Sequence, residues 1–98
     1  MVEASVAIQV LPKVSETKET IRIVDKVIDY IKSTGLYYVV GPFETTIEGD
    51  FEALCDIVKE CNKICIREGA PSVMSYVKIS YNPKGVLTID EKVEKHKR

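Results

Sequence analysis

Histidine is nearly absent from this sequence of 98 residues. The one copy is His96, close to the C-terminus. Chain ends are poorly held, which makes them a poor place for general acid–base catalysis. The sequence also lacks G-x-S-x-G, H-E-x-x-H, C-x-x-C and a glycine-rich phosphate loop. Carboxylates and Lys78 are then the groups left for chemistry, and we expect no enzyme.

Cysteine is scarce and odd in number, with Cys55, Cys61 and Cys65 close together. A structural zinc site needs four ligands, and no histidine is near. Helical spacing puts Cys61 and Cys65 on one stripe with Leu54 and Val58, where cysteine acts as a small hydrophobe. We therefore expect buried, metal-free thiols there and Cys55 as the most exposed thiol. Three reduced thiols favour a cytoplasmic location over a secreted disulfide scaffold.

Long apolar runs and an excess of one charge are missing as well. No segment reaches the roughly 18 apolar residues of a membrane span, and the first eleven residues lack the basic start of a signal peptide. The net charge is −1, which argues against a nucleic-acid partner. The basic tail Lys95–Arg98 is expected to be a solvated helix end.

Periodicity predicts alternating strands and helices. Strands are expected at 2–10, 36–42, 43–49 and 72–81, because apolar residues alternate or β-branched and aromatic residues gather there. Helices are expected at 16–34 and 51–67, and a short one from Thr88. Gly41-Pro42 is a predicted hairpin turn, and residues 82–85 a loop. The order predicts an α+β fold for a single domain, residues 1–98: a ferredoxin-like βαββαβ sandwich with a four-stranded antiparallel sheet.

The sequence also predicts where the helices end and which apolar residues each helix buries. Ser15 or Thr17 and then Asp50 are expected N-caps, and Gly35 lies where a C-cap is needed. The first helix should bury one apolar stripe, formed by Ile21, Val24, Val27, Ile28 and Ile31. The second should bury another, formed by Phe51, Leu54, Val58, Cys61 and Cys65.

Two helices cover only one face of such a sheet, so the other must meet water, a ligand or a subunit. Period-two alternation puts Ile47 in the core with Phe43 and Thr45, and Val73, Val77 and Ile79 with them. The predicted open face is mixed in polarity and contains Ser5, Ala7, Gln9, Tyr38, Val40, Glu44, Thr46, Glu48, Met74, Tyr76, Lys78 and Ser80. Such a face suits a polar pocket or a subunit interface.

Several short motifs occur in an order that resembles the thiamine-binding protein family. They are Leu11-Pro12 after the first strand, Thr45-Thr46-Ile47-Glu48-Gly49 before Asp50 and an aromatic residue, Gly69-Ala70-Pro71, Val77-Lys78-Ile79 and the closing Glu91-Lys92-Val93. The resemblance runs nearly end to end, and the Thr-Ile-Glu-Gly run is its most specific part. One departure is Glu44, where the family usually has a small residue.

The resemblance implies a ferredoxin-like fold, dimers or tetramers, and binding of thiamine or its hydroxymethylpyrimidine part, with no catalytic activity. We also expect no cofactor and no metal. An aminopyrimidine offers an amino donor and ring nitrogens, which a carboxylate and hydroxyls can pair. Thiazolium is a cation, which suits acidic and aromatic groups. The residues of these types form the predicted ligand site: Gln9, Tyr38, Thr45, Thr46 and Glu48.

Two other functions stay open at this point. In the first, the chain is an oligomeric structural or regulatory module whose open face is only an interface. In the second, it is a small enzyme that uses Glu48 and Lys78 as an acid–base pair.

Overall fold

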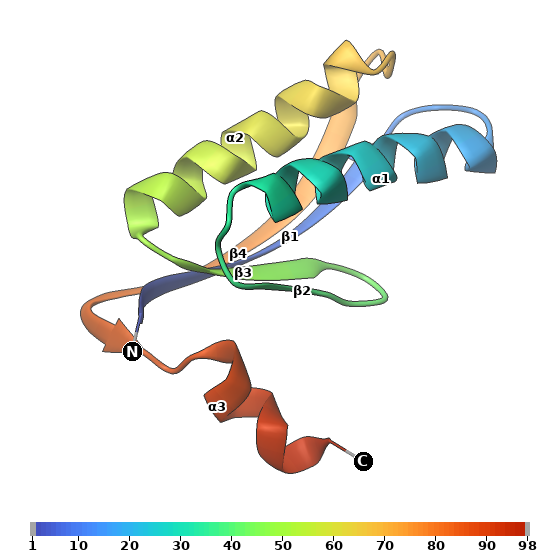
Figure 1. The fold of residues 1–98 in the computed structure, drawn as a ribbon. Coiled ribbons are helices and arrows are strands. Elements are labelled where there is room, and N and C mark those ends of the chain that lie inside the picture. Colours follow the sequence, from blue (N-terminus) through green and yellow to red (C-terminus); the bar gives the residue numbers. More distant parts are fainter. Residues whose placement is uncertain (1, 98) are drawn as a thin grey trace.

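The computed structural model describes residues 2–97, so Arg98 of the basic tail lies outside it. Four strands form one antiparallel sheet: β1 (Val2–Pro12), β2 (Tyr38–Val40), β3 (Thr45–Gly49) and β4 (Val73–Val86). Their spatial order is β2-β3-β1-β4. Helices α1 (Thr17–Ser33) and α2 (Phe51–Arg67) cover one face, as Figure 1 shows. The predicted ferredoxin-like fold is confirmed.

A short third helix lies on the other side of the sheet. The helix α3 (Ile89–Val93) continues into a 3-10 turn, Glu94–His96, and Figure 1 shows it on the side opposite to α1 and α2. Thr88 begins α3 with a capping box, because its hydroxyl accepts from the Glu91 N–H and the Glu91 carboxylate accepts from the Thr88 N–H. The face predicted to be open is therefore partly covered by the chain itself.

The core lies between the sheet and the two long helices. Ile47, Val6 and Ile8 contribute from β3 and β1, and Ile23, Val27 and Ile31 from α1. The predicted stripe on α1 was partly wrong, because Ile21 is 56% exposed and Ile23 is fully buried. Apolar residues of α1 lie on both sides of the stripe that is buried. Their spacing alone therefore did not show how the helix is rotated about its axis against the sheet. On α2 the prediction holds for Leu54, Cys61 and Cys65.

Local signals set most of the element ends. Asp50 caps α2, with its carboxylate accepting from the Ala53 N–H at 3.0 Å, as predicted. Gly35 follows α1 with a φ of +77°, a conformation that glycine adopts without strain. At the start of α1 the prediction of Ser15 or Thr17 was wrong, since Glu16 occupies the N-cap without a side-chain hydrogen bond.

The edge strand β4 is longer than predicted. It continues through Asn82–Gly85, the predicted loop, because a register shift lets Ala4 face Tyr81 while Val2 faces Val86. Tyr81 stacks on Phe51 of α2, with ring centroids 4.1 Å apart. Val77 and Ile79 have the predicted orientation, opposite Ile8 and Val6, but are 36% and 52% exposed. The helices do not reach far enough to bury them.

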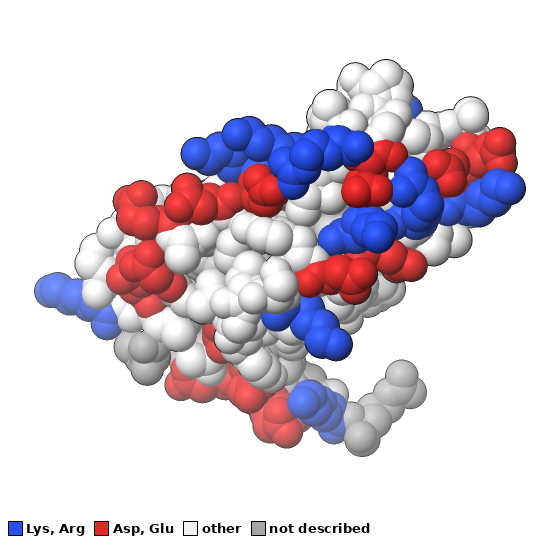
Figure 2. All heavy atoms as spheres, turned by 45° about the horizontal axis from the view of Figure 1, so that its top comes forward, with Lys and Arg blue, Asp and Glu red and all other residues white. Residues whose placement is uncertain are grey.

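The outer surface of the helices is charged in both signs. Figure 2 shows Lys and Arg in groups next to groups of Asp and Glu on this face. Arg22 of α1 forms an ion pair with Glu68, the C-cap residue of α2, at 2.8 Å. Within residues 2–97, no helix has the length and apolarity needed to cross a bilayer.

Candidate functional site

The structure separates the five predicted ligand residues into three places. Thr45 lines a cavity beside α1, and Gln9 reaches the rim of that cavity although it follows Ile8 on β1 and so lies on the sheet face opposite to α1 and α2, as predicted. Thr46 lies on that face as well, and Glu48 binds the start of α3. Tyr38 was placed on the wrong face. It pairs with Ile47 and packs against the core, while Tyr37 and Val39 point to the other side. Tyr37 and Tyr38 are adjacent and chemically identical, so the sequence alone did not show which of them faces the core. Val40, opposite Thr45, was misplaced for the same reason.

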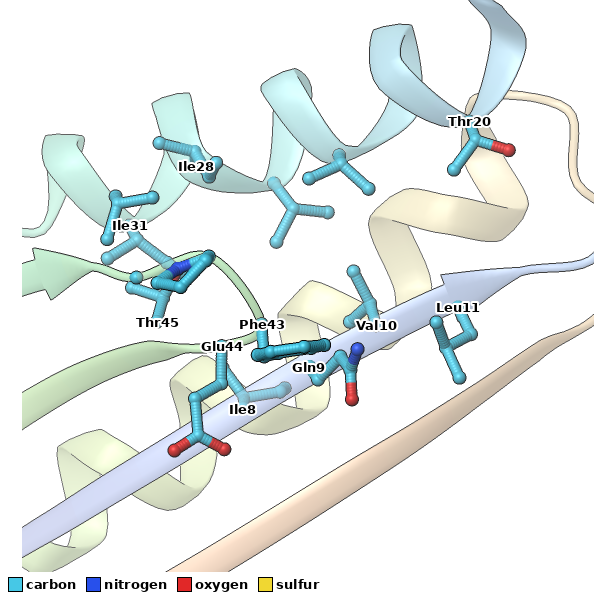
Figure 3. Close-up of a pocket in the computed structure, with 15 residues that line it drawn as sticks. Ile8, Gln9, Val10, Leu11, Thr20, Ile28, Ile31, Phe43, Glu44 and Thr45 are labelled. Carbon is cyan, nitrogen blue, oxygen red and sulfur yellow. The ribbon is translucent and has the colours of Figure 1, made fainter. Parts of the chain in front are cut away.

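The first cavity lies between α1, β1 and the hairpin that joins β2 to β3, and we call it the hairpin cavity (Figure 3). Its volume is about 240 Å³. The hairpin closes through the Gly41 N–H, which donates to the Glu44 carbonyl at 2.9 Å. A Cβ at position 41 would lie 3.0 Å from that carbonyl oxygen, a tight contact that favours glycine there. The lining is mostly apolar: Ile8, Val10, Leu11, Val24, Val27, Ile28, Ile31, Val40 and Pro42.

A few polar groups stand among these apolar residues. Thr45 is 7% exposed and faces the cavity from β3, opposite Ile8. Gln9 lines the cavity from β1, and Thr20 lines it from α1. Within residues 2–97, neither the Thr45 hydroxyl nor the Gln9 amide binds another side chain or the backbone. These two groups are therefore available to a ligand.

Phe43 and Glu44 lie at the mouth of the hairpin cavity. Phe43 was expected in the core but is 77% exposed, since residue 43 belongs to the hairpin turn and β3 begins only at Thr45. Figure 3 shows the Phe43 ring in the space between α1 and β1. Sequence reasoning missed Phe43 as a site residue, although its position directly after Gly41-Pro42 was a signal of a turn.

The sheet face opposite to α1 and α2 is called the helix-free face, because neither long helix covers it. The second hollow lies between this face and the short helix α3, and we call it the α3 groove. Its volume is about 370 Å³. Short side chains of β3, β1 and β4 form its floor, and Val39, Ile89 and Val93 form its apolar walls. Lys78 pairs with Glu44 at 3.0 Å across this face. Glu44 lines both hollows, which makes it the residue that they share.

Glu48 is committed to holding α3. It faces the helix-free side as predicted, yet it is only 8% exposed, because its carboxylate accepts from the Ile89 N–H at 2.8 Å. Tyr37 adds a second link, donating from its hydroxyl to the Asp90 carboxylate at 2.7 Å. That bond, with some burial, raises the pKa of Tyr37. Glu48 and Lys78, the acid–base pair considered above, each bind a different partner.

The cysteines lie away from both hollows. Cys61 and Cys65 are buried, as predicted, and Cys55 is half-buried. Burial raises the pKa of the Cys61 thiol to about 12 and also raises the pKa of Cys65. No three potential ligands among His, Cys, Asp and Glu come together to hold a metal within the described part of the chain.

Comparison with known proteins gives one family. The sequence profile of a family described as "Thiamine-binding protein" matches residues 6–97. A UPF0045 protein of Clostridium perfringens is 50% identical over 93 residues, covering 95% of this chain and 96% of the relative.

Two solved structures share the fold at moderate identity. A domain of unknown function from Bacillus cereus superposes with a TM-score of 0.88 at 38% identity, covering 98% of this chain and 91% of the other. A Thermotoga maritima protein, provisionally assigned to thiamine biosynthesis or salvage, gives a TM-score of 0.86 at 37% identity, with 97% and 99% covered.

Proposed function

Since this chain belongs to the thiamine-binding protein family, we propose that it binds thiamine through the hydroxymethylpyrimidine part and catalyses no reaction on it. The observation that carries the proposal is the hairpin cavity, where the Thr45 hydroxyl is free among apolar walls and the Gln9 amide is free at the rim. An aminopyrimidine needs both donors and acceptors, and an amide with a hydroxyl supplies both. The apolar walls pack against the ring faces.

The size of the cavity favours one ring inside it. Pockets for drug-sized ligands measure about 300–1,000 Å³, whereas the hairpin cavity measures about 240 Å³. The pyrimidine then fills the cavity and the thiazolium cation stays at the mouth. There the exposed Phe43 ring offers its face to a cation, and Glu44 offers a negative charge.

The lining argues for binding rather than catalysis. Glu44 is the one titratable residue among the fifteen that line the hairpin cavity, and it already pairs with Lys78. A nucleophile activated by a neighbouring base, or an acid paired with a base, takes two groups aligned with each other, and Glu44 has no second titratable side chain beside it among the residues that line the cavity. We infer a cytoplasmic location from the three free thiols.

We further infer a homo-oligomer, a dimer or tetramer, that forms along β4. This strand is an edge of the sheet, 14 residues long. It exposes large apolar side chains on both faces, namely Met74, Tyr76, Val77, Ile79 and Tyr81. Long, apolar edge strands pair with other chains unless they are protected.

The test uses two adjacent threonines with opposite orientations. Thr45→Val and Thr46→Val each remove a hydroxyl and keep the β-branched shape, but only Thr45 faces the hairpin cavity. A neutral hydrogen bond contributes about 0.5–1.5 kcal/mol. We therefore expect Thr45→Val to weaken binding of hydroxymethylpyrimidine about two- to tenfold in calorimetric titration, and Thr46→Val to bind like the parent. The reverse result would move the site to the helix-free face, and no binding by the parent would refute the proposal.

A further inference from the structure

We propose that the α3 groove is a second ligand site, which takes a small organic molecule carrying a phosphate or carboxylate group. The groove lies on the sheet face opposite to the hairpin cavity, and Glu44 is the lining residue common to both. A further hollow shares residues with each of them and is lined by Val39, Gly41, Pro42, Phe43, Glu44, Thr46 and Lys78. The α3 groove has a volume of about 370 Å³, which falls within the range of small-molecule pockets, about 300–1,000 Å³.

The floor of the groove is made by short side chains in register. Ser5 of β1 lies between Ser80 of β4 and Glu48 of β3, whose carboxylate accepts from the Ile89 N–H, and in the next row Ala7 lies between Thr46 and Lys78. The short side chains of Ser5, Ala7, Thr46 and Ser80 leave a hollow that longer residues would fill. The helix α3 closes the hollow from above, held there by Glu48 and Tyr37. The space therefore follows from the sequence of three strands and from where α3 is attached.

The polar groups of the groove favour an anion. Lys78 and Lys92 bring two ammonium groups, and Glu44 brings the one carboxylate among the residues that line it. The ammonium group of Lys78 forms an ion pair with Glu44, whereas Lys92 has no ion pair with any residue in 2–97. The hydroxyls of Ser5, Thr46 and Ser80 line the same space. Ammonium and hydroxyl groups together are good donors to phosphate or carboxylate oxygens.

The remaining walls favour an organic body over a free inorganic ion. Val39, Ile89 and Val93 enclose the groove with apolar surface, and Ile89 is 5% exposed. An inorganic ion would leave this surface unpartnered. An aromatic or aliphatic body attached to the anion would cover it. The expected ligand thus has a charged group near Lys92 and the hydroxyls, and an apolar part against Val39 and Val93.

The test is a titration of the isotope-labelled full chain, followed by the amide NMR signals. The probes are phenyl phosphate and benzoate, with inorganic phosphate and benzyl alcohol as controls. We expect saturable shifts at Ser5, Thr46, Ser80 and α3 with one or both aromatic anions, and weaker binding of each control. Tighter binding of phenyl phosphate would indicate a phosphate site, and tighter binding of benzoate would indicate a carboxylate site. Absent shifts, shifts elsewhere, or equal binding of inorganic phosphate or benzyl alcohol would overturn the proposal.

Two variants connect the binding to the groove. Lys92→Gln should weaken binding of the aromatic anion about tenfold, while Lys95→Gln, the same charge change on the exposed turn after α3, should not. Thr46→Val should weaken anion binding and leave hydroxymethylpyrimidine binding intact, which keeps this test independent of the hairpin cavity and of Lys92. Equal loss in Lys95→Gln, or no loss in both groove variants, would show that the anion binds by general charge and not in the groove.

Discussion

At the residue scale, Thr45, Thr46, Ile47 and Glu48 have four different tasks because strand side chains alternate. Ile47 is fully buried in the core and Thr45 faces the hairpin cavity on the same side of β3. Thr46 faces the α3 groove, and Glu48 holds α3. A polar strand is thus reasonable here, since three of these four side chains meet a hollow or another element rather than the core.

Glu48→Gln should loosen α3. Glutamine keeps an oxygen that can accept from the Ile89 N–H, but it loses the charge. Hydrogen bonds to a charged group contribute about 1.5–3 kcal/mol and neutral ones about 0.5–1.5 kcal/mol. We expect a loss of about 1 kcal/mol, seen as roughly fivefold faster hydrogen exchange in α3. Glu52→Gln, on the exposed side of α2, is the matched control. Unchanged exchange in Glu48→Gln would mean that this bond does not hold α3.

The three cysteines should differ sharply in reactivity. The Cys61 thiol is fully buried, with a pKa of about 12, so almost none of it is thiolate near neutral pH, and the thiolate is the nucleophile. Cys65 is buried beside it. A disulfide reagent added to native protein should modify Cys55 first and reach the other two only on unfolding. Mass spectrometry that finds rapid labelling of Cys61 would contradict the packing of α2.

At the scale of elements, α3 is attached to the sheet by hydrogen bonds from two segments. Its own capping box forms the first turn, and Tyr37 and Glu48 join it to the sheet. A helix of five residues has little stability alone. The position of α3 therefore depends on these links and on the burial of Ile89.

Alkaline pH should release α3. The Tyr37 hydroxyl donates to Asp90, and this bond together with burial raises the pKa of Tyr37 above 10.0. The neutral form is favoured in the folded state, so its contribution is complete below about pH 10 and is lost as the pH rises through the higher folded-state pKa. Methyl NMR signals of Ile89 should shift through that interval, and Tyr37→Phe should remove the transition. An identical transition in Tyr37→Phe would assign the effect to another group.

The sequence predicted the elements that depend on local chemistry. Asp50 and Thr88 were recognised as N-caps because the residues that they bind are only three positions away. Tyr38 and Ile21 were misplaced because the neighbouring residues fit either face. The binding of Glu48 to Ile89 joins residues 41 positions apart, and no periodicity reports such a contact. The two hollows, which depend on tertiary packing, were accordingly not predicted as separate sites.

At the scale of the whole molecule, the sheet is protected unequally at its two edges. The edge at β2 is only three residues long, whereas β4 has 14 residues and exposed apolar side chains. Short edge strands seldom pair with other chains, and long apolar ones do so readily. The proposed oligomer therefore uses β4.

Ile79→Lys should separate the subunits. Ile79 is 52% exposed on β4, and a lysine on an edge strand opposes strand pairing. Light scattering should give a multiple of 11.0 kDa for the parent at micromolar concentration and a shift towards the monomer for Ile79→Lys. Ile21→Lys, at an equally exposed site on α1, should leave the mass unchanged. A monomeric parent would refute the oligomer.

The position of α3 also sets an order of events in folding. Its anchors lie in β3 and just before β2, while its own residues follow β4, so it cannot dock before the sheet exists. Pairing β1 with β4 closes most of the chain into one loop, which is a slow step. Docking of α3 must come after that step. By the same reasoning α3 should open alone, many times for each global unfolding event, so the floor of the groove is exposed to solvent far more often than the core.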